Sequence, residues 1–255
     1  MEAGVVNRRV RVRADLQHRV RAIVDRIPID FGGGSSAAKA LILAELVKRG
    51  RGACSVDIGV YRGRSLLPLA TAHASLGRGR AIGVDPYSSA AAVERDAPEL
   101  WEQLQQFAST TDFDAIYVSV VSLLKSEGLT AWSEIKRATS HVGLMEIADE
   151  GVEVGLVHVD GNHDTEIVLH DVEWALRHTV PGGFIVIDDI SWRSVRPAVE
   201  RVRQNSSLLF ARVDQMNDFA VYRTPGGGRG NDHIRIALSA LNEMGDSRVS
   251  GKLDT

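Results

Sequence analysis

The central part of the chain alternates between two hydrophobic patterns. Short runs of β-branched and other apolar residues, typical of buried strands, are each followed by a turn and by apolar residues at helical spacing. The alternation predicts an α/β protein. Strands are expected at residues 55–58, 80–84, 135–139, 154–159, 184–187, 208–213 and 219–222.

The lengths of the connections predict how these strands are arranged. The first five strands are separated by segments long enough for helices, which parallel strands need for their crossovers. The last two are separated by about five residues that include Asn217 and Asp218, which favours a hairpin and an antiparallel edge. We therefore expect a doubly wound, mostly parallel, seven-stranded Rossmann-like sheet with an antiparallel edge hairpin.

The segments outside this pattern predict three regions. Apolar residues at helical spacing indicate an N-terminal helical extension over residues 1–29, ahead of a main domain over 30–224. Residues 225–255 form a Gly-rich, partly flexible tail with an expected short helix at 233–244. A longer excursion at 87–113 predicts a helix that is either a lid over a pocket or a plain surface helix.

Composition narrows the partners and the compartment. The chain has 255 residues, 44% of them hydrophobic, and a formal net charge of -3, so no general attraction to nucleic acid or an anionic membrane is expected. Small molecules are the expected partners. A single cysteine, Cys54, no signal-peptide pattern and no long apolar run predict a soluble, cytoplasmic protein. The N-terminal amphipathic helix either docks on its own sheet or forms a homo-oligomer.

Two acids and two glycines predict a cofactor site. Asp57 ends the first strand and is followed by Gly59 and Gly63, in the spacing D-x-G-x-x-x-G, and Asp85 closes the second strand. Glycine permits a sharp turn and close approach of a ligand to the backbone. An acid after the second strand can accept hydrogen bonds from ribose hydroxyls. The G-x-G-x-x-G fingerprint for a pyrophosphate is absent, and acids suit a cofactor that carries an ammonium and a sulfonium.

These residues together resemble class I S-adenosylmethionine-dependent methyltransferases. The resemblance implies that S-adenosyl-L-methionine is the cofactor and that Asp57, Gly59, Gly63 and Asp85 contact it. It also implies contacts from Ser140, near the adenine, and from Asp160. The glycine-containing segment 33–36 resembles one that folds over the methionine end of the donor; an ordinary turn with a serine N-cap is the alternative.

Three acids follow two of the expected strands. Asp160 follows the fourth strand, and Asp188 and Asp189 follow the fifth. Ligands bind at the carboxyl ends of parallel strands, so these side chains are expected to converge. Converging carboxylates repel one another unless a cation lies among them, and oxygen ligands favour Mg²⁺, with Mn²⁺ or Ca²⁺ tolerated. Alternatively, Asp160 or Asp189 caps the next helix.

The surrounding pattern is more specific. The sequence D-G-x-H-x-x-E from Asp160 to Glu166, followed by P-G-G and D-D, is similar to small-molecule O-methyltransferases of the macrocin, macrolide-sugar type, which are metal-dependent relatives of the catechol enzymes. The similarity spans about residues 30–223. It implies metal ligation by Asp160, Asp188 and Asp189, and a catalytic role for His163, as base, with Asp160.

The resulting hypothesis is O-methylation of a small-molecule hydroxyl, and two alternatives to it remain. Methyl transfer needs the acceptor oxygen in line with the methyl–sulfur bond, and a metal together with a base would deprotonate the hydroxyl. A vicinal diol on a natural-product sugar, or a catechol, would fit such a site. The alternatives are a metal-independent N- or C-methyltransferase and a non-catalytic nucleotide-binding protein of the same fold.

Overall fold

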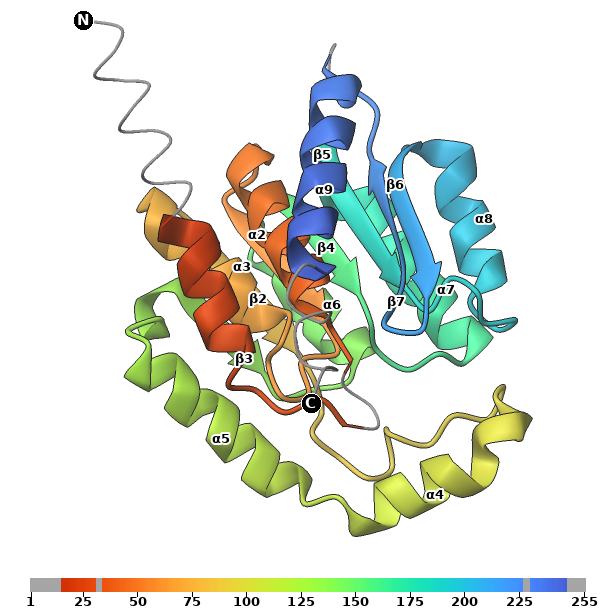
Figure 1. Ribbon diagram of the computed structural model, residues 1–255. Helices are drawn as coiled ribbons and strands as arrows, with labels where there is room; N and C mark the ends of the chain where they lie inside the picture. Colours follow the sequence, from red (N-terminus) through yellow and green to blue (C-terminus); the bar gives the residue numbers. More distant parts are fainter. Residues whose placement is uncertain (1–14, 31–33, 227–229, 247–255) are drawn as a thin grey trace, which may run out of the picture.

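A seven-stranded sheet forms the centre of the protein in the computed structural model, which describes residues 15–30, 34–226 and 230–246 (Figure 1). The strand order is β3-β2-β1-β4-β5-β7-β6. The strands β3, β2, β1, β4 and β5 run parallel to one another, and β7 is antiparallel to both β5 and β6. The predicted fold class is confirmed. The strands are β1 (Cys54–Ile58), β2 (Arg80–Val84), β3 (Ser133–Lys136), β4 (Val154–Val159), β5 (Thr179–Asp188), β6 (Ser207–Asp214) and β7 (Asn217–Arg223).

Helices cover both faces of this sheet (Figure 1). Successive side chains of a strand point to opposite faces, so Phe184 and Val186 of β5 join one core while Ile185 and Ile187 join the other. The first core contains residues from α2, α3, α5, α9 and the helix over residues 15–24; the second contains α6, α7 and α8. The helices are α2 (Ala37–Arg49), α3 (Leu66–Leu76), α4 (Trp101–Thr110), α5 (Phe113–Ser126), α6 (Ser140–Asp149), α7 (Thr165–His178), α8 (Arg196–Asn205) and α9 (Asn231–Asp246).

Two strands differ in extent from the prediction. β3 ends at Lys136, which pairs with the last residue of β2, Val84, and Thr139 instead lies in extended backbone just before α6. β5 begins at Thr179, five residues earlier than expected, and continues through the P-G-G motif at 181–183. A Cβ on Gly183 would lie 2.8 Å from the Gly155 carbonyl oxygen, so the glycine permits β5 to continue beside β4 at its irregular start.

The excursion after β2 contains a 3₁₀ turn, Pro98–Leu100, and then α4 and α5. α5 was not predicted. Its Ile116, Val120 and Leu124 are buried against the first core, whereas Trp101 at the start of α4 is 45% exposed. No single helix among the described residues is long and apolar enough to cross a membrane, although Pro98–Thr110 and Phe113–Ser126, bent by 71°, meet the length and composition criteria as a pair.

Both ends of the described chain pack against the same side of the sheet. Val20, Ile23 and Val24 of the helix over residues 15–24 are buried, and α9 packs on α2 with Leu238 and Leu241 buried. The N-terminal helix therefore docks on its own sheet, which was the first of the two alternatives given for it. The helix expected at 233–244 lies within α9, while the polar end of the tail lies outside the described residues. The proposed three-region division stays a prediction.

Candidate active site

A cavity of about 1050 Å³ opens at the carboxyl ends of the parallel strands. It lies where the strand order changes direction, with β1 leading towards β2 and β4 towards β5. Such a switch point is where open α/β sheets bind ligands. Of the residues predicted from the sequence, Asp57 and Gly63 are not among those that line the cavity. The predicted residues that do line it are Gly59, Asp85, Ser140, Asp160, His163, Asp188 and Asp189.

The glycines after β1 allow two loops to touch. Gly59 has a φ of 86°, and a Cβ there would lie 1.9 Å from the Asp160 carbonyl oxygen. The Asp160 backbone N–H donates to the carbonyl of Ile58, so the loops after β1 and β4 run in direct contact. Gly63, with a φ of 84°, lies against Leu67, whose Cδ1 would be 2.5 Å from an added Cβ. Both glycines therefore have a packing reason, and their predicted contacts with the donor stay predictions.

Asp85 organises the rim of the cavity. Its Oδ2 accepts from the backbone N–H groups of Val60 and Tyr61, at 3.0 and 2.8 Å, and its Oδ1 accepts from that of Tyr87 at 2.7 Å. Burial raises the pKa of Asp85, and these three hydrogen bonds act against that rise. The carboxylate joins the end of β2 to the loop after β1. The sequence placed Asp85 at the right edge but did not reveal these backbone partners.

Asp57 lies beneath the cavity instead of facing it. The side chain is fully buried; its Oδ2 accepts from the Ser65 hydroxyl at 2.7 Å and its Oδ1 lies 2.7 Å from His158 Nδ1. Both carboxylate oxygens are therefore engaged within the protein. The predicted contact between Asp57 and the donor stays a prediction, and the contacts observed here are those that orient His158.

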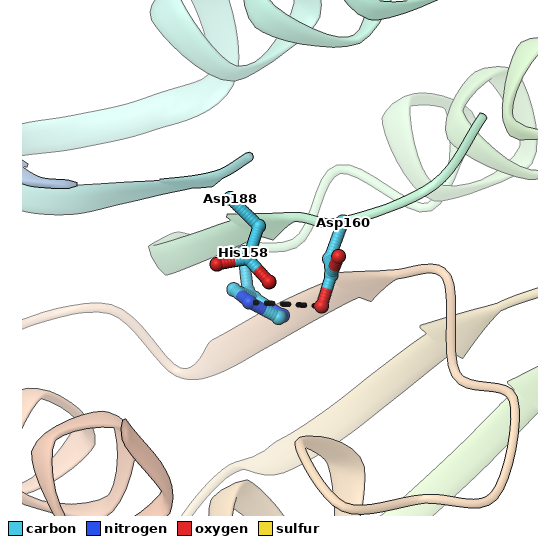
Figure 2. Close-up of side chains that lie close together, drawn as sticks. All are labelled: His158, Asp160 and Asp188. Carbon is cyan, nitrogen blue, oxygen red and sulfur yellow. Dashed lines mark ion pairs between the residues drawn. The ribbon is translucent and has the colours of Figure 1, made fainter. Parts of the chain in front are cut away.

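His158, Asp160 and Asp188 meet at the ends of β4 and β5 (Figure 2). His158 Nε2 lies 3.7 Å from Asp160 Oδ2 and is buried without a hydrogen-bond partner among the described residues. One ligand atom from each of the three residues lies within 4.8 Å of the others. The sequence analysis did not single out His158. The usable signal was its position two residues before Asp160, since alternate residues of a strand share a face.

Lys39 of α2 brings a positive charge to this group. Its Nζ lies 3.0 Å from Asp160 Oδ2 and also donates to Asp188 Oδ2, and the side chain is only 2% exposed. Burial lowers the pKa of Lys39, but the two carboxylates outweigh burial and the pKa is raised. Burial and the neighbouring Asp160 raise the pKa of Asp188 to about 6, although Lys39 opposes them. Sequence reasoning missed Lys39, although a lysine within an otherwise apolar helical run was a signal.

His163 lies between two other acids. Its Nδ1 is 2.7 Å from Glu94 Oε1, its Nε2 is 2.9 Å from Asp189 Oδ2, and its ring contacts that of Trp192 at 4.8 Å between centroids. Burial lowers the pKa of His163, but Asp189 and Glu94 outweigh burial and the pKa is raised well above 6.5. The two carboxylates therefore favour the protonated form of the imidazole.

The loop after β2 is fastened to the loop after β4. Asn162 donates from Nδ2 to the carbonyls of Ala91 and Val93, at 3.1 Å each. Asp164 accepts from the backbone N–H of Arg95 at 2.5 Å. These contacts bring Glu94 to His163, and Glu94 was not identified from the sequence because its loop shows no periodic pattern.

The three carboxylates predicted as Mg²⁺ ligands do not gather around one point. Two groups of residues in the described part of the chain could hold a metal ion. One consists of His158, Asp160 and Asp188, and the other of Asp160, His163 and Asp189. Lys39 contacts the acids of the first group, and the His163 ring lies against Asp189 in the second. The arrangement does not fit a three-carboxylate Mg²⁺ site, because protein cations already pair with these acids.

The sheet order, with acids at the ends of β2, β4 and β5 around a cavity at the switch point, defines an α/β ligand-binding domain. A family model described as a methyltransferase domain matches residues 56–190. This match covers more than half of the chain, and the protein belongs to this methyltransferase family. No curated protein matches the chain.

Solved structures share the fold at low sequence identity. The calicheamicin methyltransferase CalS11 has a TM-score of 0.57 and 15% identity, with 82% of this chain and 91% of that chain covered. An O-methyltransferase from Bacillus cereus in complex with SAH has a TM-score of 0.53 and 14% identity, covering 84% and 90%. The O-methyltransferase TomG from Streptomyces achromogenes, involved in tomaymycin synthesis and in complex with SAM, has a TM-score of 0.50 and 16% identity, covering 79% and 92%. The family match thus confirms the prediction of a methyltransferase, and these structures confirm the predicted fold.

Proposed function

We propose that the protein transfers a methyl group from S-adenosyl-L-methionine to a hydroxyl oxygen of a small molecule. The observation that carries the proposal is the imidazole of His163, held between Glu94 and Asp189 at the wall of the switch-point cavity. A positioned imidazole is the group most used to accept a proton from a reacting hydroxyl. The O-methyltransferases of similar fold that carry SAM or SAH support the same donor and acceptor atom.

The charges around the cavity suit this donor. Lys39 lies between Asp160 and Asp188, and the His163 ring lies between Glu94 and Asp189, so each basic group faces two acids. The paired groups keep an excess of negative charge, which favours a ligand with a sulfonium and an ammonium. Asp85, Gly59 and Ser140 at the cavity wall are the proposed contacts for the ribose, the methionine end and the adenine.

The reaction requires the protein to position the donor and the acceptor and to accept the proton of the hydroxyl. A cavity of about 1050 Å³ has room for a nucleoside-sized donor together with a small acceptor. The acceptor oxygen must lie in line with the methyl–sulfur bond. The methyl–oxygen bond forms as the methyl–sulfur bond breaks, and S-adenosylhomocysteine is released. The acceptor proton passes to the ring of His163 after that ring has given its own proton to solvent, and Asp160, beside the ring, stabilises the resulting imidazolium.

The acceptor is proposed by class. Leu104, Phe107 and Trp192 give one part of the cavity an apolar and aromatic lining, which suits a hydroxylated ring. A natural-product sugar or a catechol remains the proposed type of acceptor. Mg²⁺ assistance is not carried into the proposal, because Lys39 and His163 already pair with the predicted ligands.

Calorimetric titration with S-adenosylhomocysteine tests the donor site, with NADH as the control ligand. We expect one molecule of S-adenosylhomocysteine to bind and NADH not to bind. A screen of catechols and hydroxylated sugars with donor labelled in its methyl group then tests the acceptor, with matched amines in parallel. Binding of NADH alone would contradict the proposed donor, and methylation of amines but not hydroxyls would contradict the proposed acceptor.

A further inference from the structure

Lys39 is a buried lysine, and its charge must be balanced by nearby acids because it has almost no contact with water. It stands in the first turn of α2, in a run whose residues from Ala38 to Val47 are all buried. Its Nζ reaches Asp160, which follows β4, and Asp188, the last residue of β5; these two residues come directly after the register partners Val159 and Ile187. Breaking a buried ion pair by removing one partner leaves an uncompensated charge. The ammonium and the two carboxylates therefore act as one unit.

A second observation shows that this unit has the form of a cation site. His158 Nε2 is buried without a hydrogen-bond partner in the described part of the chain and faces Asp160 (Figure 2). Its other nitrogen, Nδ1, lies 2.7 Å from the carboxylate of Asp57. A carboxylate on the far nitrogen of a histidine is the arrangement that orients metal-binding histidines. One nitrogen and two carboxylates thus surround the position that the ammonium of Lys39 approaches.

We propose that Lys39 is the resident cation of this site and takes the place of a divalent metal. The ammonium and a metal ion cannot share Asp160 Oδ2 and Asp188 Oδ2, because both need these same oxygens and repel each other. Without the ammonium, His158, Asp160 and Asp188 form a vacant set of one nitrogen and two oxygen donors. Such a mixed set suits Mn²⁺ or Zn²⁺ better than Mg²⁺, which prefers oxygen ligands alone.

Resting on the proposed function, the position of Lys39 also determines how an acceptor can be held. A metal-assisted methyltransferase holds its acceptor through two adjacent oxygens on the ion. A fixed ammonium that already donates to two carboxylates offers no such pair of coordination positions. The protein is therefore expected to methylate an acceptor with a single hydroxyl as readily as its vicinal diol analogue, and to do so in the presence of a chelator.

The test is Mn²⁺ binding, measured by calorimetry and by electron paramagnetic resonance on chelator-treated full-length protein. Lys39→Gln removes the cation and Lys39→Arg retains it; Lys48→Gln, at a partly exposed lysine of the same helix that does not contact Asp160 or Asp188, is the matched control. We expect Lys39→Gln to bind Mn²⁺ about tenfold or more tightly than the wild type, Lys39→Arg and Lys48→Gln. The bound Mn²⁺ should show coupling to an imidazole nitrogen, which the double variant Lys39→Gln/His158→Gln loses.

Mn²⁺ binding by the wild type tests the proposal even if the Lys39→Gln variant fails to fold. One equivalent of tightly bound Mn²⁺ with imidazole coupling in the wild type would overturn the proposal, and so would a folded Lys39→Gln protein without any gain in affinity. Weak, non-stoichiometric Mn²⁺ binding by the wild type supports it. S-adenosylhomocysteine is titrated into the same samples, so that failure of the donor site is recognised separately from failure of the role given to Lys39.

Discussion

The carboxylate of Asp57 and the imidazole of His158 face each other across neighbouring strands, as register partners in β1 and β4. Both side chains have no exposed surface, and Asp57 Oδ1 lies 2.7 Å from His158 Nδ1. The pair ties the centre of the sheet to the acid group above it, because the other nitrogen of His158 faces Asp160. A sheet contact thus determines how one wall of the cavity is oriented.

Asp57→Ala should destabilise the protein. It leaves the Nδ1–H of His158 and the hydroxyl of Ser65 buried without their partner, at a cost of about 2 to 5 kcal/mol in the free energy of unfolding. Urea unfolding followed by circular dichroism measures this loss, with exposed Asp149→Ala as the control. Equal unfolding free energies for Asp57→Ala and the wild type would show that the pair does not stabilise the sheet.

Asp85→Ala should weaken the donor site. The backbone N–H groups of Val60, Tyr61 and Tyr87 lose their acceptor, and a donor ribose loses one too. A loss of about 1 to 3 kcal/mol in the binding of S-adenosylhomocysteine is expected. Calorimetry measures the affinity, and circular dichroism checks that the variant is folded. Unchanged affinity in a folded variant would rule out contact between Asp85 and the donor.

Methyl transfer should accelerate as the pH rises through the pKa of His163. Burial lowers this pKa, but Asp189 and Glu94 raise it well above 6.5, so the proton-accepting form becomes populated only at higher pH. The midpoint of the rise in kcat should therefore lie above 6.5. His163→Gln should reduce kcat by about 10² to 10⁴-fold and leave S-adenosylhomocysteine binding intact. A His163→Gln enzyme with full activity would exclude the role of base.

His73 should make the stability of the fold sensitive to acid. Its Nδ1–H donates to the Arg78 carbonyl and its Nε2 accepts from the Ser55 hydroxyl, each at 3.0 Å, so the neutral ring is fully paired. Burial lowers the pKa of His73 below 6.5. The unfolded chain therefore takes up this proton first as the pH falls, and stability is lost from about pH 6.5 downwards until the folded pKa is reached.

The measurement for His73 compares the wild type with His73→Gln in urea unfolding at pH 7.5 and pH 5.5. The wild type should lose up to about 1.4 kcal/mol per pH unit more than the variant over this window. A parallel loss in the two proteins would assign the acid sensitivity to other groups.

Several features of the site were readable from local sequence. Strands buried on both faces appear as short apolar runs, and acids such as Asp160 and Asp188 stand where those runs stop. Because parallel strands end at one edge, this local information also placed the acids near one another. The hairpin of β6 and β7 was predicted for the same kind of reason, since its turn is short and polar.

The partners of those acids were decided only by the tertiary structure. Lys39 is 121 residues away from Asp160 along the chain, and Glu94 is 69 residues away from His163. No local periodicity encodes such a contact, because it depends on how α2 packs on the sheet and on where Asn162 holds the loop after β2. The sequence by itself determined the sheet and the edge at which its acids gather. The packing of distant segments decided which cations neutralise them, because a buried charge is paired with whichever opposite charge the fold brings within reach.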